Sequence, residues 1–137
     1  MYFTLETDYA LRIVDFLAHS PGRSGAQLIS EETSVTLRFS LKILRKLVGC
    51  GIVRSYKGAQ GGYEIARPLD KISVADVVAA IEGQYIISRC LAEGNNCYRA
   101  GGCPYHSLFD EISHDVRKKL EKVTMQDVMD DIRREQQ

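Results

Sequence analysis

The sequence predicts a mainly α-helical fold with one small β-hairpin, arranged as a winged helix-turn-helix followed by a long C-terminal helix suited to dimerisation. Three observations predict this fold class. Three segments with helical apolar spacing precede two short β-rich runs around a glycine-rich turn, which is the element order of a winged helix. Basic residues gather in the third helix and the hairpin. A long amphipathic segment near the C-terminus has only a narrow apolar seam.

The composition is that of an ordinary soluble globular protein. The 137 residues suffice for one domain with its own core, and an apolar fraction of 45% with a charged fraction of 26% excludes disordered and fibrous classes. The first helix is too polar for a signal peptide or a membrane span, because Asp8, Arg12 and Asp15 interrupt it. We therefore expect a cytoplasmic protein with no membrane partner. In that compartment, four cysteines favour metal or redox chemistry over disulfides.

Two helices are expected before residue 33. The first has apolar residues at three- and four-residue steps, and Thr7 or Asp8 is its expected N-cap. Pro21 and the glycine after it end this helix. Ser24 with Gln27 three residues later is a capping-box pattern, which predicts a short second helix to about residue 32.

A third helix is expected from about Thr36 to Gly49, with its apolar stripe towards the core. The stripe consists of Leu37, Leu41, Leu44 and Val48, with Ile43 and Leu47 beside it. Arg38, Lys42, Arg45 and Lys46 remain on the outer side. No acidic residue lies between Glu32 and Glu64, so this block is locally basic within a chain of zero net charge. Such a block is typical of a nucleic-acid surface, although it can also be a solvated helix face.

The hairpin is expected from runs 52–56 and 63–66 around a glycine-rich tip. We expect at least one of Arg38 and Lys42 to reach base edges. Arg45, Lys46 and Arg54 should mainly neutralise phosphates, and Lys57 suits a minor-groove or flanking-phosphate contact at the wing. Phe39 and Tyr63 suit packing better than base stacking. The predicted DNA-contacting set is Thr36, Arg38, Phe39, Lys42, Arg45, Arg54, Lys57 and Gly61.

The C-terminal half is expected to contain three further helices. Ser73 with Asp76 opens one that Gly83 ends, a long helix begins near Pro104, and Thr124 opens a shorter last one. The apolar seam of the long helix consists of Phe109, Ile112, Val116, Leu120 and Val123. Such a seam flanked by charges suggests dimerisation. The expected division is a DNA-binding domain over residues 1–83, a cysteine-rich loop over 84–106, and a dimerisation helix with its tail over 107–137.

Three cysteines and one histidine occupy a single loop with the spacing Cys90-x6-Cys97-x5-Cys103-x2-His106. Three soft thiolates and an imidazole are ligands for an iron-sulfur or zinc centre, and three unrelated thiols remain the plain alternative. Cys103 is the expected cap of the helix that starts at Pro104, which would direct free N–H groups towards an anionic cluster. Cys50 lies outside this spacing and is expected to be a small buried apolar residue.

Several ordered stretches resemble the IscR and NsrR type of bacterial transcription regulators. They are TDYALR near the N-terminus, SLKILRKLVGCGIVRSYKGAQGGYEIARP over the third helix and hairpin, and KISVADVVAAIEG before the cysteine loop. The resemblance covers about residues 1–130. It implies a dimeric winged-helix protein, and many members of this family carry an iron-sulfur cluster.

The resemblance also implies a ligand set. Cys90, Cys97 and Cys103 match the three family cysteines, and His106 matches the fourth ligand of IscR-type members. Asp8 stands where NsrR-type members carry a carboxylate that completes a [4Fe–4S] cluster across the dimer. The first cysteine spacing is six residues where five is commonest in the family. Because His106 fits the IscR pattern, a [2Fe–2S] cluster is favoured over a [4Fe–4S] cluster.

The expected function is therefore that of a homodimeric regulator that binds a double-stranded DNA operator under the control of an iron-sulfur cluster. An IscR-like repressor of cluster biogenesis or related stress genes is the leading hypothesis. The alternatives are an NsrR-like nitric-oxide or iron sensor with a [4Fe–4S] cluster, or a winged-helix module with structural zinc. An enzyme acting on a small-molecule substrate is not expected, because the sequence has no C-x-x-C pair, nucleotide-binding glycine loop or paired carboxylates.

Overall fold

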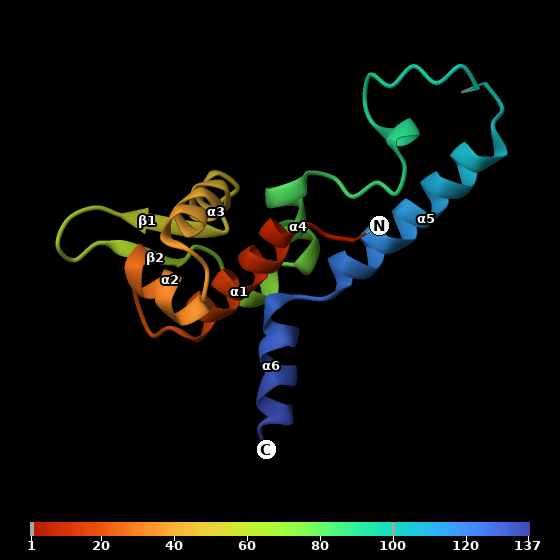
Figure 1. Cartoon of the computed structure of the whole chain (residues 1–137). Helices are drawn as coiled ribbons and strands as arrows, with labels where there is room; N and C mark the ends of the chain where they lie inside the picture. The colour runs from red at the N-terminus through yellow and green to blue at the C-terminus, as the bar shows by residue number, and fades with distance from the viewer. Residues whose placement is uncertain (1, 100) are drawn as a thin grey trace.

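The structure, a computed structural model, describes residues 2–99 and 101–137. The N-terminal half contains α1 (Leu5–His19), α2 (Ala26–Thr33), α3 (Leu37–Gly49), β1 (Val53–Tyr56) and β2 (Gly62–Ile65). It continues through the 3-10 turn η1 (Leu69–Lys71), α4 (Val74–Glu82) and a second turn, η2 (Arg89–Leu91), to α5 (Pro104–Lys122) and α6 (Met125–Glu135). The predicted order of three helices, a hairpin and a long C-terminal helix is confirmed (Figure 1).

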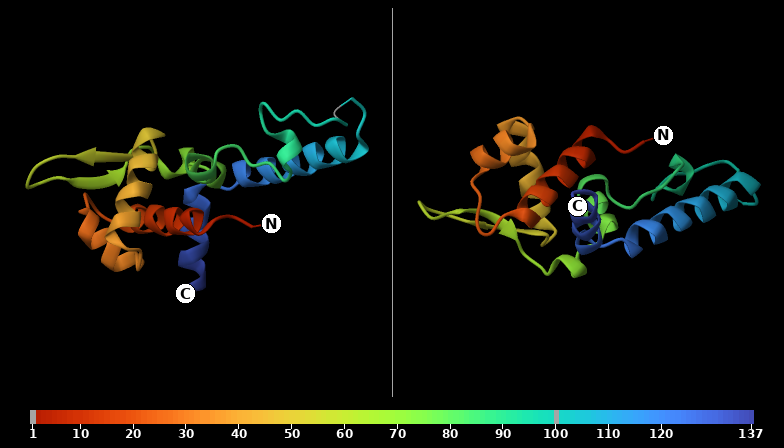
Figure 2. Two further views of the ribbon diagram at one scale, coloured as in Figure 1. Left: turned by 45° about the horizontal axis from the view of Figure 1, so that its top comes forward. Right: turned by 90° about the horizontal axis from the view of Figure 1, so that it is seen from below.

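The molecule is elongated, with the hairpin and the far end of α5 at opposite ends (Figures 1 and 2). β1 and β2 pair antiparallel, from Val53 opposite Ile65 to Tyr56 opposite Gly62. α5 leaves the helical body beside α4 and projects outwards, and the cysteine-bearing loop runs along it to its far end. None of the helices in the described ranges is long and apolar enough to cross a bilayer.

One hydrophobic core joins the N-terminal helices, α4 and α6. Its fully buried members include Ile13, Ile29, Ile43, Leu44, Leu47, Ile52, Ile72 and Val77, and Met125 is 1% exposed. Met125 reaches this core because segment 123–125 runs back beside segment 72–74, with Val74 N–H donating to Val123 O (2.9 Å) and Met125 N–H to Ile72 O (2.8 Å). α6 therefore closes the same core that α1 and α3 build.

Three predicted helix starts are confirmed. The Thr36 hydroxyl accepts a hydrogen bond from Phe39 N–H at the start of α3. Ser73 and Thr124 each form a reciprocal capping box, with Asp76 and Asp127 respectively, at the starts of α4 and α6. In each box, the cap side chain accepts a hydrogen bond from the backbone N–H three residues later, and the aspartate there accepts one from the cap N–H. All partners lie within four residues, so the sequence pattern is sufficient to predict these boxes.

Two other predicted caps are wrong. α1 begins after Thr4, and Thr7 is instead buried, where its hydroxyl donates to Glu82 Oε1 (2.6 Å). The cap of α2 is Gly25, because Ser24 is drawn into a backbone bridge with Tyr63, with N–H to O distances of 2.9 and 2.8 Å. In both cases the predicted cap residue is hydrogen-bonded to a residue distant in sequence, Thr7 to Glu82 and Ser24 to Tyr63.

Two burial predictions are also wrong. Leu37 and Leu41 of the expected core stripe are 41% and 40% exposed, since α3 is rotated to bury Ser40, whose hydroxyl donates to Val35 O (3.3 Å). Cys50 is exposed at the C-terminal end of α3 and is not a core residue.

Gly62 should be indispensable to the attachment of the hairpin. It has φ +138°, and an added Cβ would lie 2.8 Å from Ser24 O, a backbone atom held in the bridge to Tyr63. We expect Gly62→Ala to lower the free energy of unfolding by about 1–3 kcal/mol. Urea denaturation measures this value, and Gly22→Ala is the control because nothing lies within 4 Å of its added Cβ. Equal effects of the two substitutions would contradict the steric explanation.

Candidate nucleic-acid interface and cysteine loop

The outer face of α3 presents cations and apolar groups together. Arg38, Lys42 and Arg45 are exposed there. With Leu37, Phe39 and Leu41 they line a shallow groove. Phe39, predicted to pack, is 42% exposed and contacts the Tyr9 ring at 6.1 Å between centroids. Cations can bind phosphates or guanine, and apolar side chains can contact a thymine methyl group, so this face has the chemistry of a base-reading helix.

The hairpin carries a prearranged set of aromatic and basic groups. The guanidinium of Arg23, in the α1–α2 connection, lies 3.4 Å from the centroid of the Tyr56 ring. The Tyr56 hydroxyl donates to Glu64 (2.6 Å) and is 3.4 Å from Arg54 Nη1. Arg23 also donates to Gln60 O at the hairpin tip (3.3 Å). Sequence reasoning missed Arg23, because its partners lie more than thirty residues away and no local pattern marks it.

The tip itself requires glycine. Lys57 is exposed, next to Gly58 with φ +90°. A side chain at Gly61 would place its Cβ 2.8 Å from Gly58 O, so the tight turn leaves no room for one. The predicted wing residues Lys57 and Gly61 therefore both lie at the hairpin tip, where a backbone without side chains can approach a nucleic acid closely.

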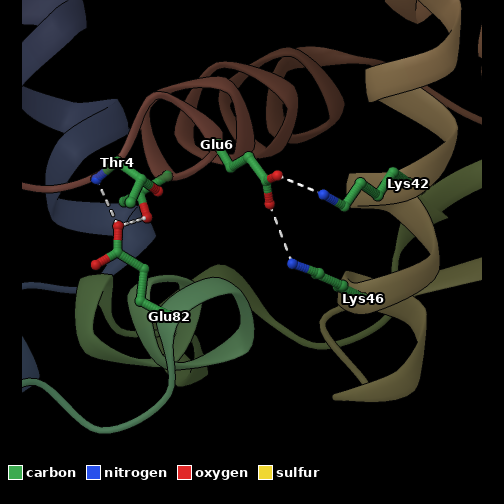
Figure 3. A network of polar contacts seen from close by, with 6 residues as sticks. Thr4, Glu6, Lys42, Lys46 and Glu82 are labelled. Atoms are coloured by element: carbon green, nitrogen blue, oxygen red, sulfur yellow. Dashed lines mark hydrogen bonds and ion pairs between the residues drawn. The ribbon is translucent and has the colours of Figure 1, made fainter.

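A polar network ties α1 to both α3 and α4 (Figure 3). The Glu6 carboxylate pairs with Lys42 (2.5 Å) and Lys46 (3.1 Å), and these hydrogen bonds hold the pKa of Glu6 below its ordinary value. Glu82 Oε1 accepts hydrogen bonds from Thr4 N–H and the Thr7 hydroxyl, both at 2.6 Å. Partial burial opposes ionisation of Glu82, but these hydrogen bonds prevail and lower its pKa. Two of the four predicted α3 cations are thus paired internally.

The start of the cysteine loop is fastened to α5. Arg117 Nη1 donates to Tyr85 O (2.7 Å), and Ile87 N–H donates to Ser113 Oγ (2.9 Å). Cys90 lies in η2 with its Sγ 3.3 Å from Ser88 Oγ. These contacts position the first cysteine beside α5.

The end of the loop is organised as predicted. Cys103 is the N-cap residue of α5, Pro104 occupies its first turn, and His106 N–H donates to Cys103 O (3.2 Å). Cys103 makes no side-chain capping hydrogen bond. Its thiol therefore stands at the positive end of a 19-residue helix.

The donor set fits an iron-sulfur cluster or zinc chemically. Cys90, Cys97 and Cys103 are free thiols of intermediate exposure, and an imidazole follows. Within residues 2–99 and 101–137, no three histidine, cysteine or acidic side chains converge as they would around a metal ion. Asp8 lies on α1 and pairs with Arg12 (2.7 Å). The structure therefore places all four predicted ligands on one loop and helix start without gathering them around a common point.

The three-helix body, hairpin and exposed basic α3 together define a winged-helix DNA-binding protein. The comparison with protein families identifies it further. Residues 3–131 match the family model Rrf2, described as an iron-dependent transcriptional regulator, and the chain belongs to this family. Its class is that of transcription regulators and not of enzymes, which confirms the expectation from the sequence.

Relatives and solved structures agree with this assignment. The chain is 25% identical over 126 residues to the helix-turn-helix-type regulator NsrR of Oceanobacillus iheyensis, covering 90% of this chain and 86% of the relative. It is 28% identical over 133 residues to protein rrf2 of Nitratidesulfovibrio vulgaris, covering 96% and 89%. Its fold is similar to that of T. potens IscR, with a TM-score of 0.80, 21% identity and coverage of 100% and 92%. Its fold is also similar to that of CymR, the global cysteine regulator of B. subtilis, with a TM-score of 0.72 and 24% identity. That match covers 93% of this chain and 95% of CymR. The predicted fold and family resemblance are confirmed.

The Glu82 contacts generate a pH-dependent prediction. The folded pKa of Glu82 lies below its ordinary value of 4.5, so its stabilisation is complete above about pH 4.5 and is lost as the pH falls through the folded pKa. Glu82→Gln should lower the free energy of unfolding at pH 7 by about 0.5–1 kcal/mol, allowing for solvent screening. The difference from wild type should shrink near pH 3.5, as measured by urea denaturation. A constant difference at both pH values, or the same loss in the control Glu135→Gln, would reject this role.

Proposed function

We propose that the protein is a homodimeric operator-binding regulator whose DNA binding is controlled by an iron-sulfur cluster. The observation that carries the proposal is the placement of three free cysteines on one loop, the last at the N-terminus of α5, in a member of a family described as iron-dependent. The similarity to IscR and NsrR supports the same proposal. Control of cluster-biogenesis or related stress genes, with repression at the operator, is the corresponding cellular role.

The exposed cations of α3 and the hairpin each have a proposed part in DNA recognition. Arg38 and Lys42 lie towards the start of α3, where a recognition helix enters the major groove. Arg38 is the base reader, whereas Lys42, beside Glu6, contacts phosphate. Arg45 and Arg54 neutralise phosphates, and Lys57 contacts the minor groove or the flanking backbone. Thr36 fixes the helix start, and Gly61 the wing turn. Phe39 lies in the groove beside Arg38 and Lys42.

The cluster would be held by Cys90, Cys97, Cys103 and His106. Three thiolates with one imidazole suit a [2Fe–2S] centre, and such a centre supplies the group that reacts with oxidants or nitric oxide. The free N–H groups at the start of α5 favour the anionic charge that the thiolates bring. If Asp8 of the other protomer replaces His106, the protein is an NsrR-like sensor with a [4Fe–4S] cluster. The same donors also suit structural zinc, which is colourless, whereas an iron-sulfur protein is brown.

Iron content tests the ligand assignment. Anaerobically purified wild type should carry about two iron atoms per chain with equal acid-labile sulfide, since this is the composition of one [2Fe–2S] cluster. Alanine at Cys90, Cys97 or Cys103 should abolish the iron, the sulfide and the visible absorption. Cys50→Ala is the matched control and should keep all three, because Cys50 is exposed at the end of α3 and remote in sequence from the loop.

Full iron in any of the three loop variants would refute that ligand set, and zinc without sulfide would favour the structural-metal alternative. About four irons per chain, lost in Asp8→Ala and retained in His106→Ala, would replace the [2Fe–2S] assignment by the [4Fe–4S] alternative.

α5 supplies the proposed dimer interface. Of its residues, all within the described part of the chain, Ser113 alone is buried. Tyr105 and Leu108 are 57% and 48% exposed. The predicted seam residues Phe109, Ile112, Val116 and Leu120 are partly buried, and Val123 is 41% exposed just beyond the helix. An apolar stripe on a projecting helix is stabilised by pairing with a second copy, and a two-fold dimer implies an approximately palindromic operator.

Charge substitution tests the seam. Ile112→Glu or Val116→Glu should convert dimers to monomers, because a dimer would bury two unpaired carboxylates, and operator affinity should fall with it. Sedimentation equilibrium measures the mass. Lys118→Glu is the control, since Lys118 is exposed and off the seam, and it should remain dimeric. Unchanged sedimentation of both seam variants would eliminate α5 as the interface.

A further inference from the structure

Glu6 occupies an unusual place between two cations of the recognition helix. It projects from the first turn of α1 towards α3, where one carboxylate oxygen meets Lys42 and the other meets Lys46 (Figure 3). The side chain of Glu6 is only 25% exposed, and those of Lys42 and Lys46 are 52% and 35% exposed. The Lys42 contact is exposed and the Lys46 contact is partly buried, so water screens the Lys46 pair less than the Lys42 pair.

The turn that carries Glu6 is itself held in place. Glu82, the last residue of α4, accepts hydrogen bonds from Thr4 N–H and from the buried Thr7 hydroxyl, which flank Glu6 in sequence. The backbone that carries the carboxylate is therefore already ordered, so pairing with the lysines costs side-chain freedom but no further backbone ordering.

The remaining cations of α3 differ from this pair. Among the ion pairs formed by residues 2–99 and 101–137, none involves Arg38 or Arg45. Yet Lys42 lines the same exposed groove as these two arginines. The groove therefore contains cations in two electrostatic states, two arginines open to an incoming phosphate and one lysine already paired with a carboxylate.

We propose that Glu6 is an internal competitor of DNA phosphate for Lys42 and Lys46, and so limits the electrostatic part of operator binding. One carboxylate between two ammonium groups leaves that corner of α3 with one net positive charge instead of two. DNA must exchange a lysine–carboxylate contact for a lysine–phosphate contact, and it meets the Glu6 charge as it approaches. This inference rests on the proposed use of α3 as the DNA-reading helix.

The test removes the charge and keeps the shape. Glu6→Gln should bind DNA about two- to fivefold more tightly at low salt and make the slope of log K against log salt steeper by about one, because one more phosphate is neutralised. The probes are a duplex selected by the wild-type protein from a random library and a scrambled duplex of the same composition. Both should gain affinity, since phosphate contacts carry no sequence information.

Two controls isolate the pair. Asp131→Asn removes an equal charge from α6, where Asp131 pairs with Arg134, and should leave the salt slope unchanged. In the Lys42→Gln, Lys46→Gln background, Glu6→Gln should have no further effect on affinity, because the lysines it would release are gone. Thermal denaturation of every variant sets a temperature at which all are folded, and binding is compared there.

The outcomes separate this inference from the proposed function. If Arg38→Ala weakens binding while Glu6→Gln leaves it unchanged or weakens it, α3 reads DNA and the competitor role is wrong. A gain that persists in the double-lysine background would also refute it, since the effect would then be unspecific. If Arg38→Ala and Glu6→Gln both leave both duplexes bound as in wild type, α3 is not the DNA-reading surface and both proposals fail.

Discussion

The arrangement of this molecule depends on the short pairing of segment 72–74 with segment 123–125. These two backbone hydrogen bonds, together with buried Met125, fasten the base of α5 to the body. The chain leaves that body at Glu82, and α5, with 19 residues, is about 28 Å long at 1.5 Å per residue. Residues 83–103 must therefore span this length outwards before α5 can return. The cysteine loop consequently runs beside α5, and its end at Cys103 is far from the hairpin (Figures 1 and 2).

This geometry limits how the proposed cluster at the loop could influence the proposed DNA-reading helix. Cys103 stands at the outer end of α5, so a direct contact with α3 within one protomer is excluded by the length of that helix. Two physical connections remain. One is α5 itself, through the seam that would position two recognition helices. The other begins at Glu82, directly before the loop, and passes through the first turn of α1 to Glu6 and the α3 lysines. The first connection is one continuous helix, and the second is a contiguous set of hydrogen-bonded and ion-paired groups.

Local sequence patterns predicted the helix starts that depend on neighbouring residues. They did not predict the contacts between residues that are far apart in the sequence. The capping boxes at Ser73 and Thr124 and the Cys103–Pro104 helix start each involve residues within three positions. Thr7 and Ser24 had equally good local patterns, but Glu82 and Tyr63, distant in sequence, hold them otherwise. For the same reason Glu6 and Arg23 were not recognised as part of the candidate interface. Leu37 and Leu41 were misassigned because a leucine stripe fits two helix rotations, and burial of Ser40 decides between them.

The exposed leucines and the paired lysines favour selectivity over affinity in the proposed interface. Lysine and arginine contacts to phosphate strengthen binding to every duplex alike. A regulator with many unpaired cations is therefore held mostly at non-specific DNA sites. On α3, Glu6 occupies part of that charge, while Leu37 and Leu41 lie beside Arg38 at the groove. Apolar contacts distinguish thymine by its methyl group, and a bidentate arginine distinguishes guanine. Lowering the sequence-independent term and adding apolar contacts both raise the ratio of specific to unspecific binding. The exposure of these leucines, which a purely structural helix would not need, fits the proposed use of this face for contacts with bases.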